Sequence, residues 1–348
     1  MFKPKYKYTD KIIESLKRIA VSREVVINAP LIPRWEVSLR KDAIIRSAHS
    51  STSIEGNNLS LAQVSELAAG RKIMAKRKDK EEVLNYISVL EKLDIFAKKE
   101  IITEEVIKKI QQMLTKDTLE DMDDCGVYRC ERNKYVVVGN RLTGEISFKP
   151  PANGELPQLM RDYVEWLNSA RTVKLDPVVL AGIAHYEFVR IHPFVDGNGR
   201  TARVIAALLL RMRGFDTKQF FCLDDYYDID RKEYYQALRS VDRAKRDMTK
   251  WLEYFVEGVA VSLESVRNRV ALLSSERAKT KKKGQIALTE KQMRIVEYIN
   301  KNGRITISDM ASMFKITRQA ALKEIGKLVK LDIIKREGQA RASYYVMR

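Results

Sequence analysis

Apolar residues recur at the spacing of an α-helix along most of this 348-residue chain, and this pattern limits its fold more than any other feature. The composition agrees with it: 45% of the residues are hydrophobic and only 15 are Gly and 8 Pro, which excludes collagen-like and wholly disordered chains. We therefore expect a mainly α, globular protein with a sizeable core. The segments that carry the pattern are Ile12–Ile27, Val64–Leu67, Val83–Phe96, Val106–Leu114, Leu156–Leu167, Val178–Val189, Val204–Met212, Tyr234–Val241 and Trp251–Leu272.

The stretch 134–148 departs from the helical pattern. Two β-prone runs, Tyr135–Val138 and Ile146–Phe148, flank a middle that contains Gly and Asn, and Pro150 and Pro151 follow them. Such a sequence predicts a small β-hairpin with a sharp end.

Charge is unevenly distributed along the chain. The chain has 64 Lys and Arg against 46 Asp and Glu, a net charge of +18, which favours an anionic partner or substrate. Residues 279–348 hold 17 basic and 6 acidic residues, so this tail carries +11 of the +18. The cationic run at 279–284 has no apolar periodicity, which is typical of a linker before a separate domain at 285–348.

Other sequence features exclude several classes of protein. The longest aliphatic runs, such as Val204–Leu210, are far shorter than the ~20 residues of a membrane-spanning helix. The first residues, Met1–Lys7, lack the apolar region of a secretory signal. Three cysteines, Cys125, Cys130 and Cys222, are too few and too scattered for a disulfide framework or a four-ligand zinc site. We expect a cytoplasmic protein with no membrane partner.

The most informative stretch is His192–Arg203, which lies between two segments of helical periodicity and therefore predicts a helix–loop–helix turn. Gly197 and Gly199 permit backbone angles and close approaches that side chains would block. The second helix opens near Arg200, and its first N–H groups lack intrahelical acceptors. These groups lie at the positive end of the helix dipole, which suits a phosphate chain.

Four side chains add chemistry to this loop. Arg200 and Arg203 lie three residues apart on the second helix and supply charge-assisted donors. Asp196 offers the hard carboxylate oxygen that Mg²⁺ prefers. His192 stands just before the loop, where its imidazole could take a proton from an attacking hydroxyl. Each residue alone fits a structural role, but together they favour a site that handles phosphates.

The twelve residues match, position for position, the signature His-Pro-Phe-x-Asp/Glu-Gly-Asn-Gly-Arg-x-x-Arg, so the chain resembles the Fic family over roughly residues 1–270. The resemblance implies an all-α Fic fold, with 1–110 as an N-terminal helical region and 111–278 as the catalytic core. It implies transfer of AMP from ATP, with Mg²⁺, to a Ser, Thr or Tyr hydroxyl of a protein. The implied roles are general base for His192, Mg²⁺ ligand for Asp196, backbone cradle of the α- and β-phosphates for Gly197, Asn198 and Gly199, and contacts of the outer phosphates for Arg200 and Arg203.

A second motif, at residues 51–56, follows a helix-like stretch. A helix C-terminus explains Gly56 but not Glu55, because the helix dipole disfavours an acidic group there. The stretch resembles the Fic inhibitory motif Ser/Thr-x-x-x-Glu-Gly/Asn. This resemblance implies that Ser51, Glu55 and Gly56 form an inhibitory segment, in which Glu55 pairs with Arg203 and keeps the γ-phosphate of ATP from docking productively.

Two further features resemble Fic proteins. A hairpin at this position, the flap, docks a target segment by strand addition in that family, which makes Val136, Val137 and Val138 candidate docking residues. A hairpin that only covers the core is the alternative. Tyr234 and Tyr235 resemble the aromatic residues of the adenosine-side helix, although aromatic pairs on helices are usually part of a core.

The basic tail resembles a winged helix-turn-helix domain. We expect Ser308 to cap the second of its helices. In this architecture the third helix enters the major groove and Arg341, at the tip of the wing, meets phosphate, so DNA is the implied partner and a protein-interaction module is the alternative. The expected elements are helices at Gln292–Asn300, from Thr306 and at Thr317–Leu331, and strands at Ile333–Arg336 and Ser343–Val346.

The leading hypothesis is an autoinhibited protein adenylyltransferase with an appended winged helix, which modifies protein hydroxyls, its own included. One alternative is a transcriptional regulator whose Fic part senses nucleotide without turnover; the intact His192 and Asp196 count against it. Another is a bifunctional enzyme in which Glu55 also positions water to remove AMP. The sequence leaves open the target protein, the DNA site and whether the chain forms a homodimer.

Overall fold

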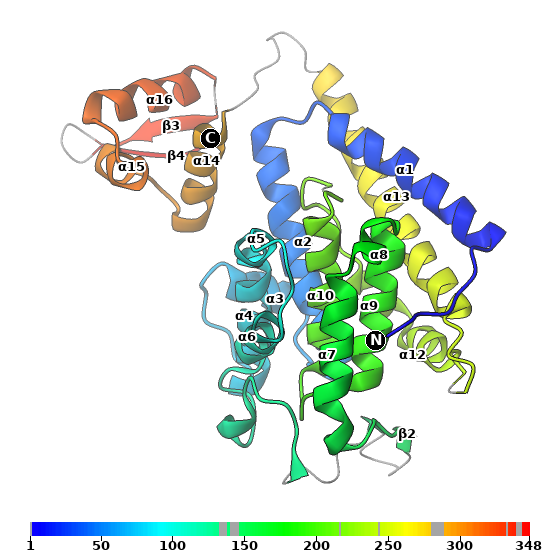
Figure 1. Cartoon of the computed structure of the whole chain (residues 1–348). Coiled ribbons are helices and arrows are strands. Elements are labelled where there is room, and N and C mark those ends of the chain that lie inside the picture. Colours follow the sequence, from blue (N-terminus) through cyan, green and yellow to red (C-terminus); the bar gives the residue numbers. More distant parts are fainter. Residues whose placement is uncertain are drawn as a thin grey trace. The chain divides into compact units, whose positions relative to one another are not determined.

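The structure is a computed structural model that describes residues 2–131, 138–139, 146–215, 217–242, 244–279, 289–331, 333–338 and 343–348 (Figure 1). The chain divides into two compact units. The first comprises residues 1–27 and 43–267, and the second comprises residues 28–42 and 268–348. The expected linker residues 280–284 lie outside the described residues.

The first unit is almost entirely helical, as the apolar spacing predicts. Its mainly α character is confirmed, and the apolar stripes of its helices meet in one continuous core. Three of its helices, α1, α2 and α13, include residues assigned to the second unit. The helices are α1 (Asp10–Asn28), α2 (Pro33–Ile54), α3 (Leu61–Ala68), α4 (Arg77–Glu91), α5 (Leu93–Ala97), α6 (Glu104–Thr115), α7 (Leu156–Leu167), α8 (Ala170–Val173), α9 (Pro177–Ile191), α10 (Asn198–Met212), α11 (Asp224–Ile229), α12 (Arg231–Arg239) and α13 (Thr249–Lys279), with short 3₁₀ turns at Met122–Asp124 and Asn153–Glu155.

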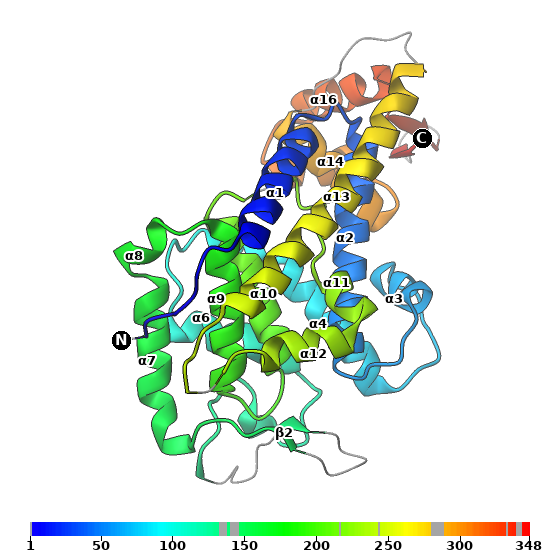
Figure 2. The same ribbon diagram turned by 90° about the vertical axis from the view of Figure 1, so that its right-hand side faces the viewer.

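Helices α9 and α10 run beside each other through the first unit, as both views show (Figure 1 and Figure 2). Helix α9 begins with Asp176 as its N-cap and Pro177 as its first residue, and it is buried on nearly every side. It packs against α7 and α10, while α10 also packs against α6. The indole N–H of Trp251, on α13, donates to the carbonyl of Gly182 at 2.8 Å. The two helices that flank the signature loop are therefore anchored in the core.

A short hairpin interrupts the helices between α6 and α7. Strand β1 (Val138–Gly139) pairs antiparallel with β2 (Ile146–Phe148), and Val138 lies opposite Phe148. The predicted hairpin is therefore present. Val136 and Val137, two of the candidate docking residues, lie outside the described residues.

In the second unit, the described residues from 289 onward form three helices followed by two strands, in the order expected of a winged helix. They are α14 (Glu290–Asn302), α15 (Ile307–Phe314), α16 (Arg318–Lys330), β3 (Ile334–Glu337) and β4 (Tyr344–Met347). Strands β3 and β4 pair antiparallel, with Lys335 opposite Val346. Ile299, Ile325 and Leu328 lie in the core of this unit. Arg341, the expected wing-tip contact, lies outside the described residues.

The N-cap prediction for α15 is wrong by two residues. Thr306, not Ser308, caps the helix: its hydroxyl accepts from the Asp309 N–H at 3.1 Å. The Asp309 carboxylate accepts in return from the Thr306 N–H at 2.9 Å, which completes a reciprocal capping box. A cap two residues further on would give up both bonds.

Within the described residues, no helix is both long enough and apolar enough to cross a membrane.

The close approach of α9 and α13 at Gly182 generates a stability prediction. A Cβ atom at Gly182 would lie 2.9 Å from Leu252 Cδ2 and 2.9 Å from Phe255 Cδ1, and both side chains are fully buried. Gly182→Ala should therefore lower the free energy of unfolding by about 1–3 kcal/mol, the usual effect of overpacking. Denaturant titration measures this change. Gly154→Ala is the control, because a Cβ there meets no atom within 4 Å; equal stability of the two variants would contradict the prediction.

Candidate active site

The signature stretch forms the turn between α9 and α10. His192 follows α9 in the left-handed backbone region, with φ of 51°, and Gly197 precedes α10 with φ of 80°. Asn198 fastens the loop to itself: its Oδ1 accepts from the Phe194 N–H at 2.9 Å and its Nδ2 donates to the Phe194 carbonyl at 2.8 Å. This side chain is buried and both of its polar atoms bond to the Phe194 backbone, so Asn198 acts on the shape of the loop.

The start of α10 is open to an anion. Gly197 occupies the N-cap position and supplies no side-chain acceptor to the first N–H groups of the helix. The Gly197 N–H itself donates to Asp196 Oδ1 at 2.6 Å. Uncapped N–H groups at the positive end of a helix dipole can hold phosphate oxygens. The backbone here fits the triphosphate that the Fic resemblance implies.

The His192 imidazole is neutral and oriented. Its Nδ1 lies 3.2 Å from the Val189 carbonyl, which can only accept, so Nδ1 carries the proton and Nε2 keeps a free lone pair. Burial lowers the pKa of His192 to about 4, an effect that the Val189 carbonyl opposes only in part. His192 also lines a cleft of about 860 Å³, so its unprotonated nitrogen can accept a proton from a hydroxyl in that cleft.

Arg129, which the sequence patterns did not identify, holds the backbone of His192 in place. This arginine is buried, and its Nε donates to the His192 carbonyl at 2.8 Å. Its Nη2 donates to the Pro151 carbonyl at 2.7 Å, and its backbone N–H donates to the Pro193 carbonyl at 2.9 Å. Arg129 precedes the hairpin and Pro151 follows it, so one guanidinium ties both ends of the hairpin to the histidine.

Asp196 and Arg200 form an ion pair at the start of α10. Burial favours the neutral form of Asp196, but Arg200 and the Gly197 N–H outweigh this effect and lower the pKa of the carboxyl. Arg200 is almost completely buried and does not line the cleft: Nη2 lies 3.2 Å from Asp196 Oδ1, and Nη1 lies 3.7 Å from Glu82 Oε1. The carboxylate of Asp196 is ionised and partly exposed, which fits a Mg²⁺ ligand.

Arg203 and the second motif come together. The Arg203 Nε donates to Ser51 Oγ at 2.6 Å, and Nη2 donates to the Ser51 carbonyl at 2.9 Å and to Glu55 Oε1 at 2.8 Å. The same Nε also lies 3.5 Å from Asp224 Oδ1. Burial raises the pKa of Asp224 to about 6, although Arg203 opposes this shift. The guanidinium side chain is only 2% exposed, so these oxygens replace its hydration shell.

Glu55 lies directly against the glycine loop. A Cβ atom at Gly199 would overlap with Glu55 Oε1, far inside van der Waals contact. A side chain at this position would push the carboxylate away from its present place. Gly56, which has φ of 96°, turns the chain away at the end of α2, so Glu55 remains at the mouth of the loop.

The two tyrosines of α12 differ in their surroundings. Tyr234 is buried and its hydroxyl lies 2.9 Å from His185 Nε2, as expected of a core residue. Tyr235 is exposed, and its hydroxyl donates to the Ile54 carbonyl at 3.4 Å. Both rings line the same cleft as His192, Arg203 and Glu55, so they can offer aromatic surface to a bound base.

Comparison with known proteins agrees with this geometry. Residues 101–210 match the Fic/DOC family, and residues 288–335 match a winged helix-turn-helix DNA-binding family. The chain therefore contains a Fic domain. Its relatives include the protein adenylyltransferase Fic of Drosophila melanogaster, 33% identical over 186 residues, and that of Drosophila virilis, 34% identical over 185. Each match covers 51% of this chain and 34% of the relative, so the chain spans about a third of the length of these proteins.

Solved structures share the fold. A Fic family protein from Desulfovibrio desulfuricans G20 matches with a TM-score of 0.64 and 20% identity, over 100% of this chain and 98% of that one. Fic-1 from C. elegans matches with a TM-score of 0.60 and 24% identity, over 78% of this chain and 74% of that one.

The state of His192 can be measured without any substrate. The chain has 3 histidines, and burial lowers the pKa of His192 to about 4 and that of His185 to about 3. In protein labelled with ¹³C-histidine, the resonances of both imidazoles should remain those of the neutral ring between about pH 5.5 and 8, where an unperturbed histidine titrates. His192→Asn assigns its resonance by removing it. A titration midpoint near the ordinary value would show that His192 is more solvated than the geometry indicates.

Proposed function

We propose that this protein is a protein adenylyltransferase that its own Glu55 holds inactive. The observation that carries the proposal is the contact of Glu55 with Arg203 directly beside Gly199, in the cleft that also exposes the neutral His192. The matches to named protein adenylyltransferases support the reaction class.

In this proposal, each group of the loop has one task. The ATP substrate, with Mg²⁺ at the Asp196 carboxylate, supplies an activated α-phosphate. The N–H groups at the start of α10 and the side chain of Arg203 bind and neutralise the phosphates. His192 Nε2 takes the proton of the target hydroxyl, whose oxygen bonds to the α-phosphorus while the bond to the β-phosphate breaks and pyrophosphate leaves. Arg129 holds the backbone of His192 in the geometry that this transfer needs.

Inhibition follows from competition for one cation. Arg203 is buried and can contact an anion mainly from the side where Glu55 lies, because Ser51 and Asp224 occupy its other sides. A phosphate and a carboxylate cannot share this position without strong repulsion. The bound nucleotide therefore adopts a geometry in which the α-phosphorus is not aligned with the hydroxyl, and transfer is slow.

Removal of the Glu55 carboxylate should activate the protein. Glu55→Gly should raise AMP transfer by about tenfold or more, a range typical of coupling between competing sites, because Arg203 becomes free for phosphate. The measurement is incorporation of label from α-labelled ATP with Mg²⁺ into the protein itself and into added protein. His192→Ala in the Glu55→Gly background should lose transfer by ~10²–10⁴-fold and still bind ATP.

Arg203→Ala is the second control, since it should stay inactive with or without Glu55→Gly. A folded Glu55→Gly protein that binds ATP but labels no better than wild type would place the brake elsewhere. Label that appears as free AMP after first entering protein would favour the bifunctional alternative, in which Glu55 also positions water. Binding of ATP without any transfer in all variants would favour the nucleotide sensor.

We propose further that the basic tail binds DNA through the exposed face of α16. Arg318 and Lys323 are exposed on this helix, whereas Lys327 is already paired with Glu324 at 2.7 Å. The winged helix-turn-helix DNA-binding match supports this partner.

The tail proposal predicts a salt-dependent affinity. The logarithm of the binding constant should fall linearly with the logarithm of salt concentration. Arg318→Ala with Lys323→Ala should reduce the slope by about 2, one for each lost phosphate contact. Lys327→Ala should change it less, because Glu324 already neutralises that lysine. Fluorescence anisotropy with duplex DNA measures these slopes, and no binding at low salt would favour a protein-interaction module.

A further inference from the structure

The turn after Glu55 is held by a buried asparagine. Asn57 comes two residues after Glu55, and its side chain is buried. Its Oδ1 accepts from the Leu59 N–H at 3.1 Å, and its Nδ2 donates to the Asp79 carbonyl at 2.9 Å. The Asn57 backbone N–H donates to the Thr52 carbonyl at 3.1 Å, which closes the end of α2. Asn57 therefore fixes the position of the turn that carries Glu55.

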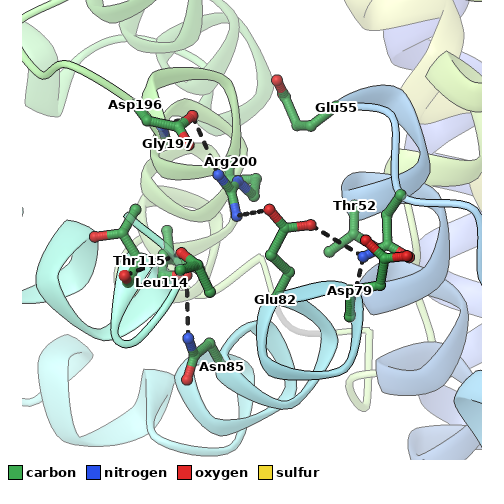
Figure 3. Close-up of polar contacts among 12 residues, drawn as sticks. Thr52, Glu55, Asp79, Glu82, Asn85, Leu114, Thr115, Asp196, Gly197 and Arg200 are labelled. Carbon is green, nitrogen blue, oxygen red and sulfur yellow. Dashed lines mark hydrogen bonds and ion pairs between the residues drawn. The ribbon is translucent and has the colours of Figure 1, made fainter. Parts of the chain in front are cut away.

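The second partner of Asn57 Nδ2 is Glu82, on α4. Glu82 Oε2 accepts from Asn57 Nδ2 at 3.0 Å, and the other oxygen, Oε1, lies 3.7 Å from Arg200 Nη1. Figure 3 shows this carboxylate between the two segments, with Arg200 and Asp196 on one side and the end of α2 on the other. One side chain thus touches both the turn after Glu55 and an arginine of the signature loop.

A carboxylate at this position needs both partners. Glu82 is buried, and a buried carboxylate is costly unless a cation and hydrogen-bond donors compensate for its lost hydration. Arg200 supplies the cation and Asn57 supplies the donor. A carboxylate has two acceptor oxygens and a carboxamide has one, so a glutamine here could accept from Asn57 or face Arg200 with an oxygen, but not both.

We propose that Asn57 and Glu82 are positioning residues for the inhibitory glutamate, and that they connect the turn carrying Glu55 to the arginine beside the phosphate site. This inference rests on the proposed role of Glu55. The Glu55 side chain alone makes one short contact with Arg203, whereas the Asn57–Glu82 contact holds the backbone behind it. Loss of the latter allows Glu55 to leave Arg203 more often, even though Glu55 and Arg203 are unchanged.

Hydrogen exchange tests the structural half of the proposal without any nucleotide. Glu82→Gln should speed amide exchange in residues 51–57 by roughly fivefold, which corresponds to the loss of about one net hydrogen bond. Asn57→Ala should speed it at least as much, because it also removes the bonds to the Leu59 N–H and the Asp79 carbonyl. The matched controls are the same changes one residue away, Asn58→Ala at an exposed position and Glu81→Gln at a half-exposed one, and these should exchange like wild type. Amide exchange in α9 serves as the measure of global unfolding. If Asn57→Ala does not fold, Glu82→Gln alone is used for the test.

Transfer assays test the regulatory half. Each of the two variants should raise AMP transfer by roughly fivefold or more in the wild-type background. The double variant should exceed Asn57→Ala by little, because Asn57→Ala already removes the contact on which Glu82→Gln acts. In the Glu55→Gly background neither should raise transfer further, since the group that they position is gone. A purely structural weakening of the fold would instead lower transfer in both backgrounds.

The outcomes separate this proposal from the proposed function. If Glu55→Gly activates transfer but Asn57→Ala and Glu82→Gln leave both exchange and transfer at wild-type values, the Asn57–Glu82 proposal is overturned and the proposed function stands. If Glu55→Gly does not activate transfer, the proposed function fails. In that case, faster amide exchange in residues 51–57 of Asn57→Ala and Glu82→Gln would still show that the Asn57–Glu82 contact holds the turn. Unchanged exchange would refute this structural role too.

Discussion

The site depends on one buried cation. The Arg203 guanidinium is removed from water and surrounded by the Ser51 hydroxyl and carbonyl, Glu55 and Asp224. A charge in this environment is stable only while its oxygen partners stay in place. Arg203 therefore draws together α10, the end of α2 and the start of α11, three segments that are far apart in the sequence. The cleft takes its shape from this convergence.

The helices behind the loop make this arrangement rigid. Helices α9 and α10 are buried on most of their surfaces, and Asn198 and Arg129 fasten the loop between them to its own backbone and to the base of the hairpin. The left-handed backbone of His192 is tolerated because these bonds determine it from both sides. Preorganisation of this kind allows a few side chains to act at fixed positions without a conformational search.

The sequence predicted the parts of the molecule that depend on local patterns. Apolar spacing located the helices, and the glycine loop, Arg203 and Glu55 were identified together because each belongs to a compact motif. Arg129, Glu82 and Asn57 were not identified, because the contacts that tie them to the site span 25 to 118 positions of the sequence and no local spacing marks them. The cap of α15 was misplaced because two candidate hydroxyls lie two residues apart, and only the position of Asp309 selects Thr306.

The burial of Arg203 also restricts what can displace Glu55. A neutral molecule that pushed the carboxylate aside would leave a dehydrated guanidinium with Asp224, at 3.5 Å and with a raised pKa, as its nearest remaining acid. In the proposed mechanism, an incoming anion therefore replaces Glu55 at a lower cost than a neutral molecule does. A nucleoside without phosphates brings no negative charge for this exchange, however well its base fits the cleft. Charge balance, rather than shape, sets the condition for release.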